Sequence, residues 1–167
     1  LIGLCVPLFS QQKGLTGEWE LVPQNSSVIA LYNTLSITMT RRGTLFSITH
    51  TWGRGRSFID QLEFRADGTR QTVPVRDRVW PTNVFMGVSM DTSLSRVIQA
   101  RVKGDDRVLT LDIAFYVRAS QGRKKIESVH TYTYDKGEDI LRFSVERSTR
   151  ADEQIEYVLK RKGSRQA

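Results

Sequence analysis

The fold is decided by residues 107–134, which read RVLTLDIAFYVRASQGRKKIESVHTYTY. In both halves of this stretch apolar or aromatic side chains recur at every second position, as in Leu109, Leu111 and Ile113. Alternation with a period of two is typical of a β-strand that buries one face. Between the halves, Gly122 supplies a residue that readily adopts a positive φ angle. The stretch therefore predicts two antiparallel strands joined by a tight turn.

The same alternation continues through the rest of the chain from residue 14 onward, interrupted by turns that contain Gly, Asn or Asp. Helical periodicity is nearly absent, and only residues 25–33 are expected to form a short helix, because Asn25 or Ser26 can cap a single turn. Residues 76–83 are expected to form a longer loop. We predict strands at residues 17–22, 35–40, 44–52, 57–65, 69–75, 84–91, 95–103, 107–118, 125–134, 140–148 and 154–161.

Length and composition are those of a single globular domain. The chain has 167 residues, of which 39% are hydrophobic and 26% charged, with 12 glycines and 4 prolines. These values exclude disordered and fibrous classes. Lys and Arg outnumber Asp and Glu by 25 to 18, and the resulting net charge of +7 favours anionic partners or surfaces. With 2 histidines and 1 cysteine, the chain cannot build a four-ligand Cys/His zinc site or a multi-disulfide framework.

The first twelve residues differ from the rest because they carry no charge. Their apolar run ends at Phe9, well short of the roughly 20 residues that a membrane span needs. We interpret residues 1–12 as the remnant of a secretory signal peptide cleaved near Ser10, followed by a barrel domain at residues 13–161 and a polar tail at 162–167. The alternative is a buried N-terminal strand. Cleavage would remove Cys5, and a chain without cysteine suits an oxidising periplasmic or secreted location.

Short strands in meander order must protect their edges from pairing with other chains. A single domain of this size does so most simply by closing its sheet into a barrel or by stacking two sheets. We favour the barrel. The predicted fold class is therefore all-β, a single antiparallel up-and-down β-barrel of about 8–10 strands with at most one short helix.

The segment Leu15-Thr16-Gly17-Glu18-Trp19-Glu20-Leu21 resembles the Gly-x-Trp opening of lipocalin-like (calycin-type) β-barrel proteins. It is most similar to small secreted bacterial proteins that open with a Thr-Gly-x-Trp-x-Leu strand. The resemblance implies that Trp19 packs at the closed end of the barrel beneath a cation from a late strand, for which Arg142 and Lys160 are the candidates. It also implies that a small apolar molecule binds inside. The segment between the first two strands is too short for the helix pair that covers fatty-acid-binding proteins.

Two strand faces combine aromatic rings with a few polar groups, as a small-molecule pocket requires. Both faces are expected to point into the barrel, where the rings supply contact area and the histidines orient a polar group of the ligand. The alternative is that these residues form a hydrogen-bonded core. The candidate ligand-binding residues are Phe46, Ile48, His50, Trp52, His130, Tyr132 and Tyr134.

Basic residues gather at the expected strand ends. If several of these loops share one rim, they would attract an anionic group; if they are divided between the two ends, they only increase solubility. Arg54 and Arg56 are the candidates to guard the rim. The sequence contains neither a basic helix nor an RNP-type aromatic motif, so we expect no nucleic-acid partner. The basic clusters are Arg41 and Arg42, Arg54 and Arg56, Arg76 and Arg78, residues 123–125, and residues 160–162 with Arg165.

The sequence contains no Gly-x-Ser-x-Gly elbow, no His-Glu-x-x-His motif and no phosphate-binding loop. Asp60 and Glu63 lie on opposite faces of one expected strand, so they cannot act together on one reaction centre. We expect no cofactor and no metal. The leading expectation is a non-enzymatic extracytoplasmic protein that binds a small apolar or amphipathic molecule, possibly anionic. The alternatives are a barrel-fold isomerase or hydrolase that uses His130 and Tyr132, and a cell-envelope interaction module with a filled barrel.

Overall fold

The computed structural model describes residues 14–27, 33–54, 56–81, 87–149 and 151–163. Apart from one 3-10 turn at Pro23–Asn25, every regular element of these residues is a β-strand. None of their helices is long and apolar enough to cross a membrane. The strands are β1 (Gly17–Leu21), β2 (Thr34–Arg42), β3 (Leu45–Arg54), β4 (Arg56–Arg65), β5 (Asp67–Val73), β6 (Ser89–Met90), β7 (Arg96–Lys103), β8 (Val108–Ala119), β9 (Gly122–Asp135), β10 (Ile140–Arg147) and β11 (Ile155–Arg161).

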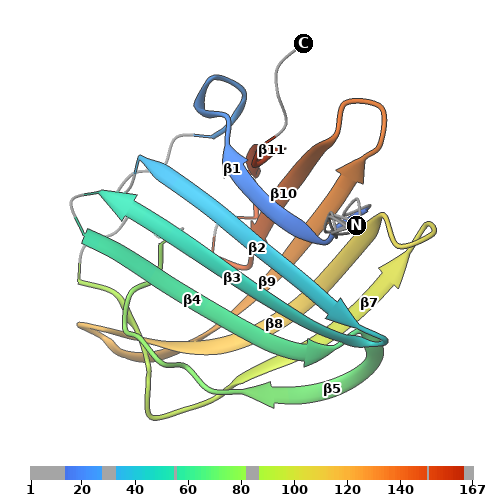
Figure 1. Ribbon diagram of the computed structural model, residues 1–167. Coiled ribbons are helices and arrows are strands. Elements are labelled where there is room, and N and C mark those ends of the chain that lie inside the picture. The colour runs from blue at the N-terminus through green and yellow to red at the C-terminus, as the bar shows by residue number, and fades with distance from the viewer. Residues whose placement is uncertain (1–13, 28–32, 55, 82–86, 150, 164–167) are drawn as a thin grey trace, which may run out of the picture.

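The strands form one antiparallel sheet that curls into a nearly closed barrel (Figure 1). Around the barrel the order is β4-β3-β2-β1-β11-β10-β9-β8-β7-β5, and β6 pairs with the end of β8. Most strands that are paired in this order follow each other along the chain. The exceptions are β1 with β11, the first and last strands, and β5 with β7, which β6 separates in the chain. The predicted up-and-down barrel is confirmed.

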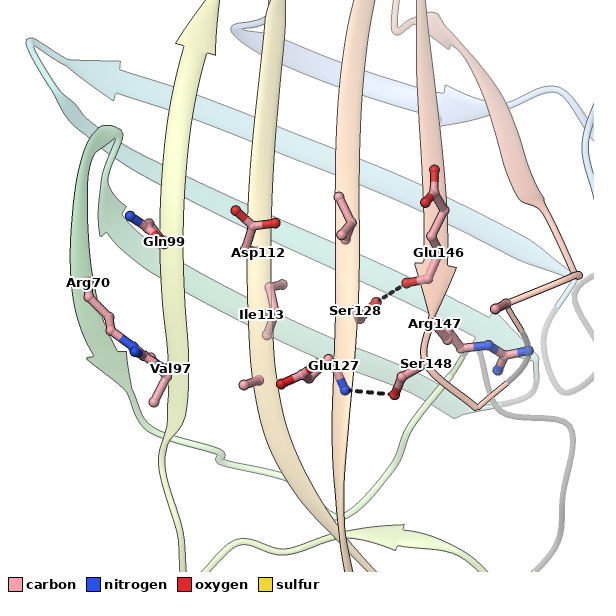
Figure 2. Close-up of a pocket in the computed structure, with 13 residues that line it drawn as sticks. Arg70, Val97, Gln99, Asp112, Ile113, Glu127, Ser128, Glu146, Arg147 and Ser148 are labelled. Carbon is pink, nitrogen blue, oxygen red and sulfur yellow. Dashed lines mark hydrogen bonds between the residues drawn. The ribbon is translucent and has the colours of Figure 1, made fainter.

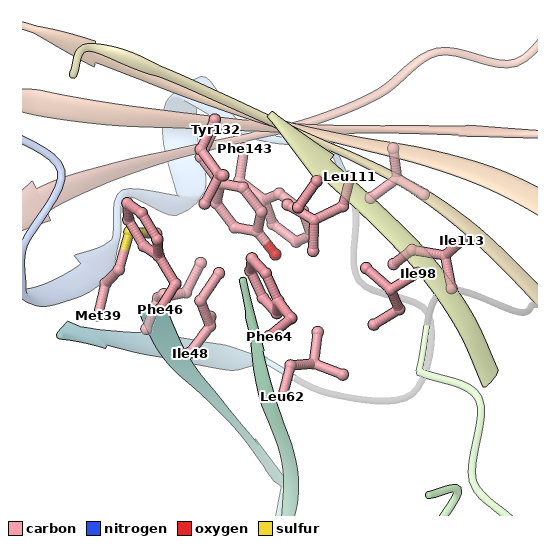
Figure 3. Close-up of a cluster of buried hydrophobic side chains, with 14 of the residues drawn as sticks. Met39, Phe46, Ile48, Leu62, Phe64, Ile98, Leu111, Ile113, Tyr132 and Phe143 are labelled. Atoms are coloured by element: carbon pink, nitrogen blue, oxygen red, sulfur yellow. The ribbon is translucent and has the colours of Figure 1, made fainter. Parts of the chain in front are cut away.

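Alternation builds the barrel core as the sequence predicts. On β8 the side chains of Leu109, Leu111 and Ile113 are buried, whereas Asp112 between them is exposed. Figure 3 shows side chains from opposite walls meeting in the interior, with Phe46 and Phe64 on one side and Tyr132 on the other. The rings of Phe46 and Phe64 stack with their centroids 6.2 Å apart. Burial of such rings is the main stabilising contribution to this fold.

Two local predictions need correction. Of the expected strand at residues 84–91, the described residues 87–91 contain only β6, because Gly87 has a positive φ of 85° and the Ser93 amide donates to the Asp91 carboxylate at 3.0 Å in the turn that follows; residues 84–86 lie outside the described part. The expected helix at residues 25–33 is represented by the 3-10 turn at Pro23–Asn25, and residues 28–32 lie outside the described part. Ser26 is the C-terminal cap of that turn: its amide donates to the Pro23 carbonyl at 3.3 Å, and its hydroxyl donates to the Val22 carbonyl at 2.8 Å.

The barrel has one seam, between β4 and β5, the two ends of the strand order. Within the described residues no ladder joins these strands, although they follow each other along the chain. Beside the connecting turn, the Gln71 side chain forms two hydrogen bonds with the β4 backbone, as a paired strand would. Its amide oxygen accepts from the Arg65 amide at 2.8 Å, and its nitrogen donates to the Arg65 carbonyl at 2.7 Å. These two hydrogen bonds close this end of the seam against the backbone of β4.

Candidate functional site

The two strand faces predicted to line the interior do so. On β3 the side chains of Phe46, Ile48, His50 and Trp52 are all buried. On β9, His130 and Tyr132 lie on the same inward face, and Tyr132 is fully buried. These residues occupy different levels of the barrel, however. Their side chains therefore divide between a packed end and a polar end.

The packed end is the one that contains Trp19, and we call it the Trp19 end. The indole nitrogen of Trp19 donates to the Leu15 carbonyl at 3.0 Å. The Tyr134 ring lies 5.9 Å from the Trp19 ring, which places this predicted ligand contact in the packed end instead of beside a cavity. The Arg161 guanidinium lies 4.1 Å from the Trp19 ring centroid and donates to Asp139 at 3.0 Å.

The cation over Trp19 therefore differs from both sequence candidates. Arg142 points to the outer surface, where it pairs with Glu138 and Glu156. Lys160 is exposed. Alternation explains the difference: Arg161 continues the inward face of Tyr157 and Leu159 along β11, whereas Lys160 lies on the opposite face.

A cluster of polar side chains occupies the other half of the interior. His50 on β3 lies directly opposite Asp60 on β4, and the His50 Nε2 atom is 2.9 Å from the Tyr132 hydroxyl. Asp60 in turn accepts two hydrogen bonds from the Arg96 guanidinium, both at 2.9 Å. This bidentate pair joins β4 to the start of β7, on the two sides of the seam. It is the only ion pair of the described residues that links β4 to β7.

Of these polar groups, His50, Asp60 and Arg96 line a small cavity with a volume of about 50 Å³. Since one water needs about 10–15 Å³ on this measure, the cavity has room for a few waters or for a head group such as a carboxylate. A site that encloses a drug-sized molecule has a volume of about 300–1,000 Å³, so this cavity is too small to enclose one. The lining residues are His50, Trp52, Asp60, Trp80, Pro81, Met90, Arg96, Ile113, Phe115, His130 and Phe143. We call this the cavity end of the barrel.

Burial sets the protonation states in this cavity. It lowers the pKa of His50 to about 4, and burial together with the charge of His50 lowers the pKa of His130 to about 3. Burial alone would raise the pKa of Asp60, but the Arg96 hydrogen bonds and charge hold the pKa of that carboxyl below its usual value. Near neutral pH both histidines are therefore neutral, whereas Asp60 and Arg96 are charged.

Two polar atoms of this cluster have no hydrogen-bond partner among the described residues: Nδ1 of His130 and Nε of Arg96. Both atoms are buried, and both residues line the cavity. A buried polar group without a partner destabilises a protein by about 1–3 kcal/mol. Such groups call for an explanation, and water or a ligand in the adjoining space is the usual one.

The barrel-enzyme alternative predicted that His130 and Tyr132 act as an acid and base pair. The hydroxyl of Tyr132 instead faces His50. Burial raises the pKa of Tyr132 well above its usual value while it lowers the pKa of His50. These shifts oppose proton transfer from the tyrosine to the histidine near neutral pH.

Sequence reasoning missed the Asp60–Arg96 pair. A signal was present in each strand: Asp60 alternates with Phe58, Leu62 and Phe64, and Arg96 with Ile98 and Ala100. A charged residue on an apolar face predicts either a strand end or a buried partner of opposite charge. Glu63, predicted to lie on the opposite face of the strand from Asp60, is exposed.

The basic clusters divide between the two ends of the barrel. Arg76, Arg78 and residues 123–125 lie at the cavity end, and the backbones of Arg54 and Arg56 pair there at the end of the β3–β4 hairpin. Arg41 and Arg42 lie at the Trp19 end. Arg123 is held in place by the buried carboxylate of Asp91, at 2.7 Å. The basic clusters therefore do not share one rim, and part of the charge at the cavity end balances Asp91.

A larger hollow of about 440 Å³ lies on the outer face of the strands β5 to β10 (Figure 2). Its main polar groups are satisfied within the protein. The Glu127 amide donates to the Ser148 hydroxyl at 3.1 Å, and the Ser128 hydroxyl donates to the Glu146 carbonyl at 2.8 Å. The Asp112 carboxylate pairs with Arg101 at 3.3 Å.

Among the described residues no group of three or more His, Cys, Asp and Glu side chains could hold a metal ion. Searches for a matching family model, a matching curated protein and a matching solved structure give no match. The nearly closed antiparallel barrel is compatible with a lipocalin-like fold. The structure is therefore a barrel with a packed Trp19 end and a polar cavity end.

Proposed function

We propose that this chain is a lipocalin-like binding protein that holds a small amphipathic molecule by its polar head, inside the cavity end of the barrel. The observation that carries this proposal is the unpartnered Nδ1 of His130 in the cavity wall. A neutral histidine beside a cavity can donate or accept one hydrogen bond to a bound group. If this position served stability alone, an apolar side chain would stabilise the barrel more than a histidine with an unpartnered nitrogen.

The apolar surroundings support the same proposal. The rings of Trp52, Trp80, Phe115 and Phe143 line the cavity together with Met90. A site built from rings and one or two directed polar groups is typical of small-molecule binding. The cavity is small, so it accommodates the head of such a molecule and not the whole of it.

The experiment that tests this proposal is native mass spectrometry of the protein purified from its own cells, before and after delipidation. We expect an adduct that delipidation removes. The variant His130→Leu should lose the adduct and yet unfold at higher urea concentration than the wild type, because it removes an unsatisfied buried group.

Ser128→Ala is the matched control. Ser128 lies on the same inward face of β9, but its hydroxyl already donates to the Glu146 carbonyl at 2.8 Å. This variant should be less stable by about 1 kcal/mol and should keep the adduct. A bare mass under both conditions, together with a destabilised His130→Leu variant, would favour the filled-barrel interaction module instead.

We also propose an extracytoplasmic location, periplasmic or secreted. It is supported by the uncharged apolar character of residues 1–12, which lie outside the described part, and by the position of the only cysteine, Cys5, within them. Fractionation of cells that express the whole coding sequence, with N-terminal sequencing of the exported protein, tests it. Retention of the protein in the cytoplasm with residues 1–12 intact would contradict it.

A further inference from the structure

The seam between β4 and β5 has a groove on its outer side with a volume of about 160 Å³. Its walls are β4 on one side and residues 75–79 on the other. Asp60, Met90 and Arg96 line both this outer groove and the interior cavity. The same three side chains thus form the wall between the groove and the hollow inside.

That wall consists of side chains only. Elsewhere the barrel wall is a continuous ladder of backbone hydrogen bonds, whereas β4 and β5 share no ladder in the described residues. Beyond Gln71, the polar link across the seam is the Asp60–Arg96 pair. The Asp60 side chain is 28% exposed and the Arg96 side chain only 6%. Asp60 is therefore closer to water than Arg96.

The outer groove is lined by apolar and polar side chains in about equal share. Phe58, Val75, Val79 and Met90 contribute to it, and Ile59 beside them is 59% exposed. Covering the exposed isoleucine with an apolar chain removes apolar surface from water and is therefore favourable. Besides Asp60 and Arg96, the charged side chains of the groove are Arg76 and Asp77, which are of opposite sign.

We propose that this seam is a lateral access route for an amphipathic carboxylic acid, whose carboxylate replaces Asp60 on Arg96 while its apolar tail lies in the outer groove. The inference rests on the proposed function and adds to it the class of ligand and the route. Asp60 already shows which chemistry Arg96 accepts: two coplanar oxygens bound by the guanidinium fork. With its head in the cavity and its tail in the groove, a ligand larger than the cavity fits without being enclosed.

The first arm of the test measures binding of decanoic acid and of decanol by titration calorimetry. Wild-type protein should bind the acid more tightly than the alcohol. Asp60→Asn removes the competing carboxylate charge, so the acid should bind about tenfold more tightly. Arg96→Met should abolish the preference for the acid and leave binding of the alcohol nearly unchanged.

The pair formed by Arg101 and Asp112 supplies matched controls. It has the same residue types, but it lies on the outer surface with both side chains about half exposed. Arg101→Met and Asp112→Asn should leave the preference for decanoic acid unchanged.

The second arm tests the route in a Cys5→Ser background. Ile59→Cys is labelled with a bulky maleimide at the mouth of the groove, and Glu63→Cys, exposed on the same strand outside the groove, is its control. Stopped-flow tryptophan fluorescence should show association of decanoic acid slowed at least about tenfold by the label at position 59 and unchanged by the label at position 63.

The outcomes separate this inference from the proposed function. If neither decanoic acid nor decanol binds and purified protein carries no adduct, the proposed function fails, and the inference fails with it. If either molecule binds while Asp60→Asn leaves the acid affinity unchanged, or the label at position 59 leaves the rate unchanged, only the lateral, carboxylate-specific inference is overturned. Because Asp60→Asn and the label leave Arg96 in place, the test does not depend on a stable Arg96→Met variant.

Discussion

The two ends of this barrel solve the problem of buried polar groups in opposite ways. At the Trp19 end the polar side chains bind one another: Arg161 donates to Asp139 and to the Thr16 carbonyl, and the Tyr134 hydroxyl donates to Asp139 at 3.1 Å. At the cavity end Nδ1 of His130 and Nε of Arg96 are buried without a partner in the described residues. One barrel can therefore have an end whose polar groups stabilise the fold and an end that keeps hydrogen-bonding capacity for another molecule.

The packing of aromatic rings follows the same division. The Trp19 side chain is fully buried beneath the Arg161 guanidinium. Trp80 at the cavity end is half-buried and touches the barrel through an edge contact with Phe115, at 5.3 Å between ring centroids. Since stability depends on buried area, changes at the Trp19 end should cost more.

The largest expected effect is the loss of stability in acid, which comes from the cavity end. The pKa of His50 is lowered to about 4 and that of His130 to about 3, from 6.5, so the unfolded chain takes up protons first as the pH falls. The stabilisation present above pH 6.5 is therefore lost between pH 6.5 and about 4. The expected slope is about 1.4 kcal/mol per pH unit for each histidine.

Urea unfolding at several pH values between 7 and 4 measures this slope. The double variant His50→Asn, His130→Leu should flatten it, whereas Arg142→Ala on the outer surface should not. An unchanged slope in the double variant would mean that groups outside the cavity cause the acid sensitivity.

The second expected effect concerns Trp19. Trp19→Ala removes a fully buried ring and should lower the free energy of unfolding by about 3–5 kcal/mol. Trp80→Ala should cost less than half as much, because Trp80 is already partly exposed. Urea denaturation of both variants at pH 7 tests this, and equal losses would remove the contrast between the two ends.

The third expected effect concerns the seam. Arg96→Met leaves the Asp60 carboxylate in the barrel wall without its partner, which should cost about 3 kcal/mol, whereas Arg101→Met in the exposed pair should cost less than about 1 kcal/mol. The double variant Asp60→Leu, Arg96→Met should regain most of the loss, since it removes both charges. A double variant as unstable as Arg96→Met would show that the pair holds the seam by more than its charges.

The smallest expected effect concerns the cation over Trp19. Arg161→Lys keeps the charge but loses the planar stacking and several directed hydrogen bonds, so we expect a loss of about 1 kcal/mol. Arg142→Ala, at one of the two positions that the sequence offered for the cation, should change stability by less than about 0.5 kcal/mol. Thermal unfolding of the two variants measures both effects, and the reverse order would restore Arg142 as the important cation.

Period-two alternation made much of this predictable. It placed Phe46, Ile48, His50 and Trp52 on one inward face, and it placed Asp112 outside. It also separated Asp60 from Glu63, because neighbouring faces of one strand are fixed locally. Alternation says nothing about which strand lies across the barrel. The pairs Asp60 with Arg96 and His50 with Tyr132 therefore could not be derived from it, since their members are 36 and 82 residues apart.

The sequence by itself determined the strands, the turns, the meander and the inward faces, because each of these depends on neighbours within a few residues of the chain. Only the tertiary structure decided that Arg161 covers Trp19, that the barrel leaves a seam between β4 and β5, and that a cavity separates Arg96 from His130. These features depend on how the sheet curls and on which side chains fill its interior. Small differences in packing settle both, and no local pattern encodes them.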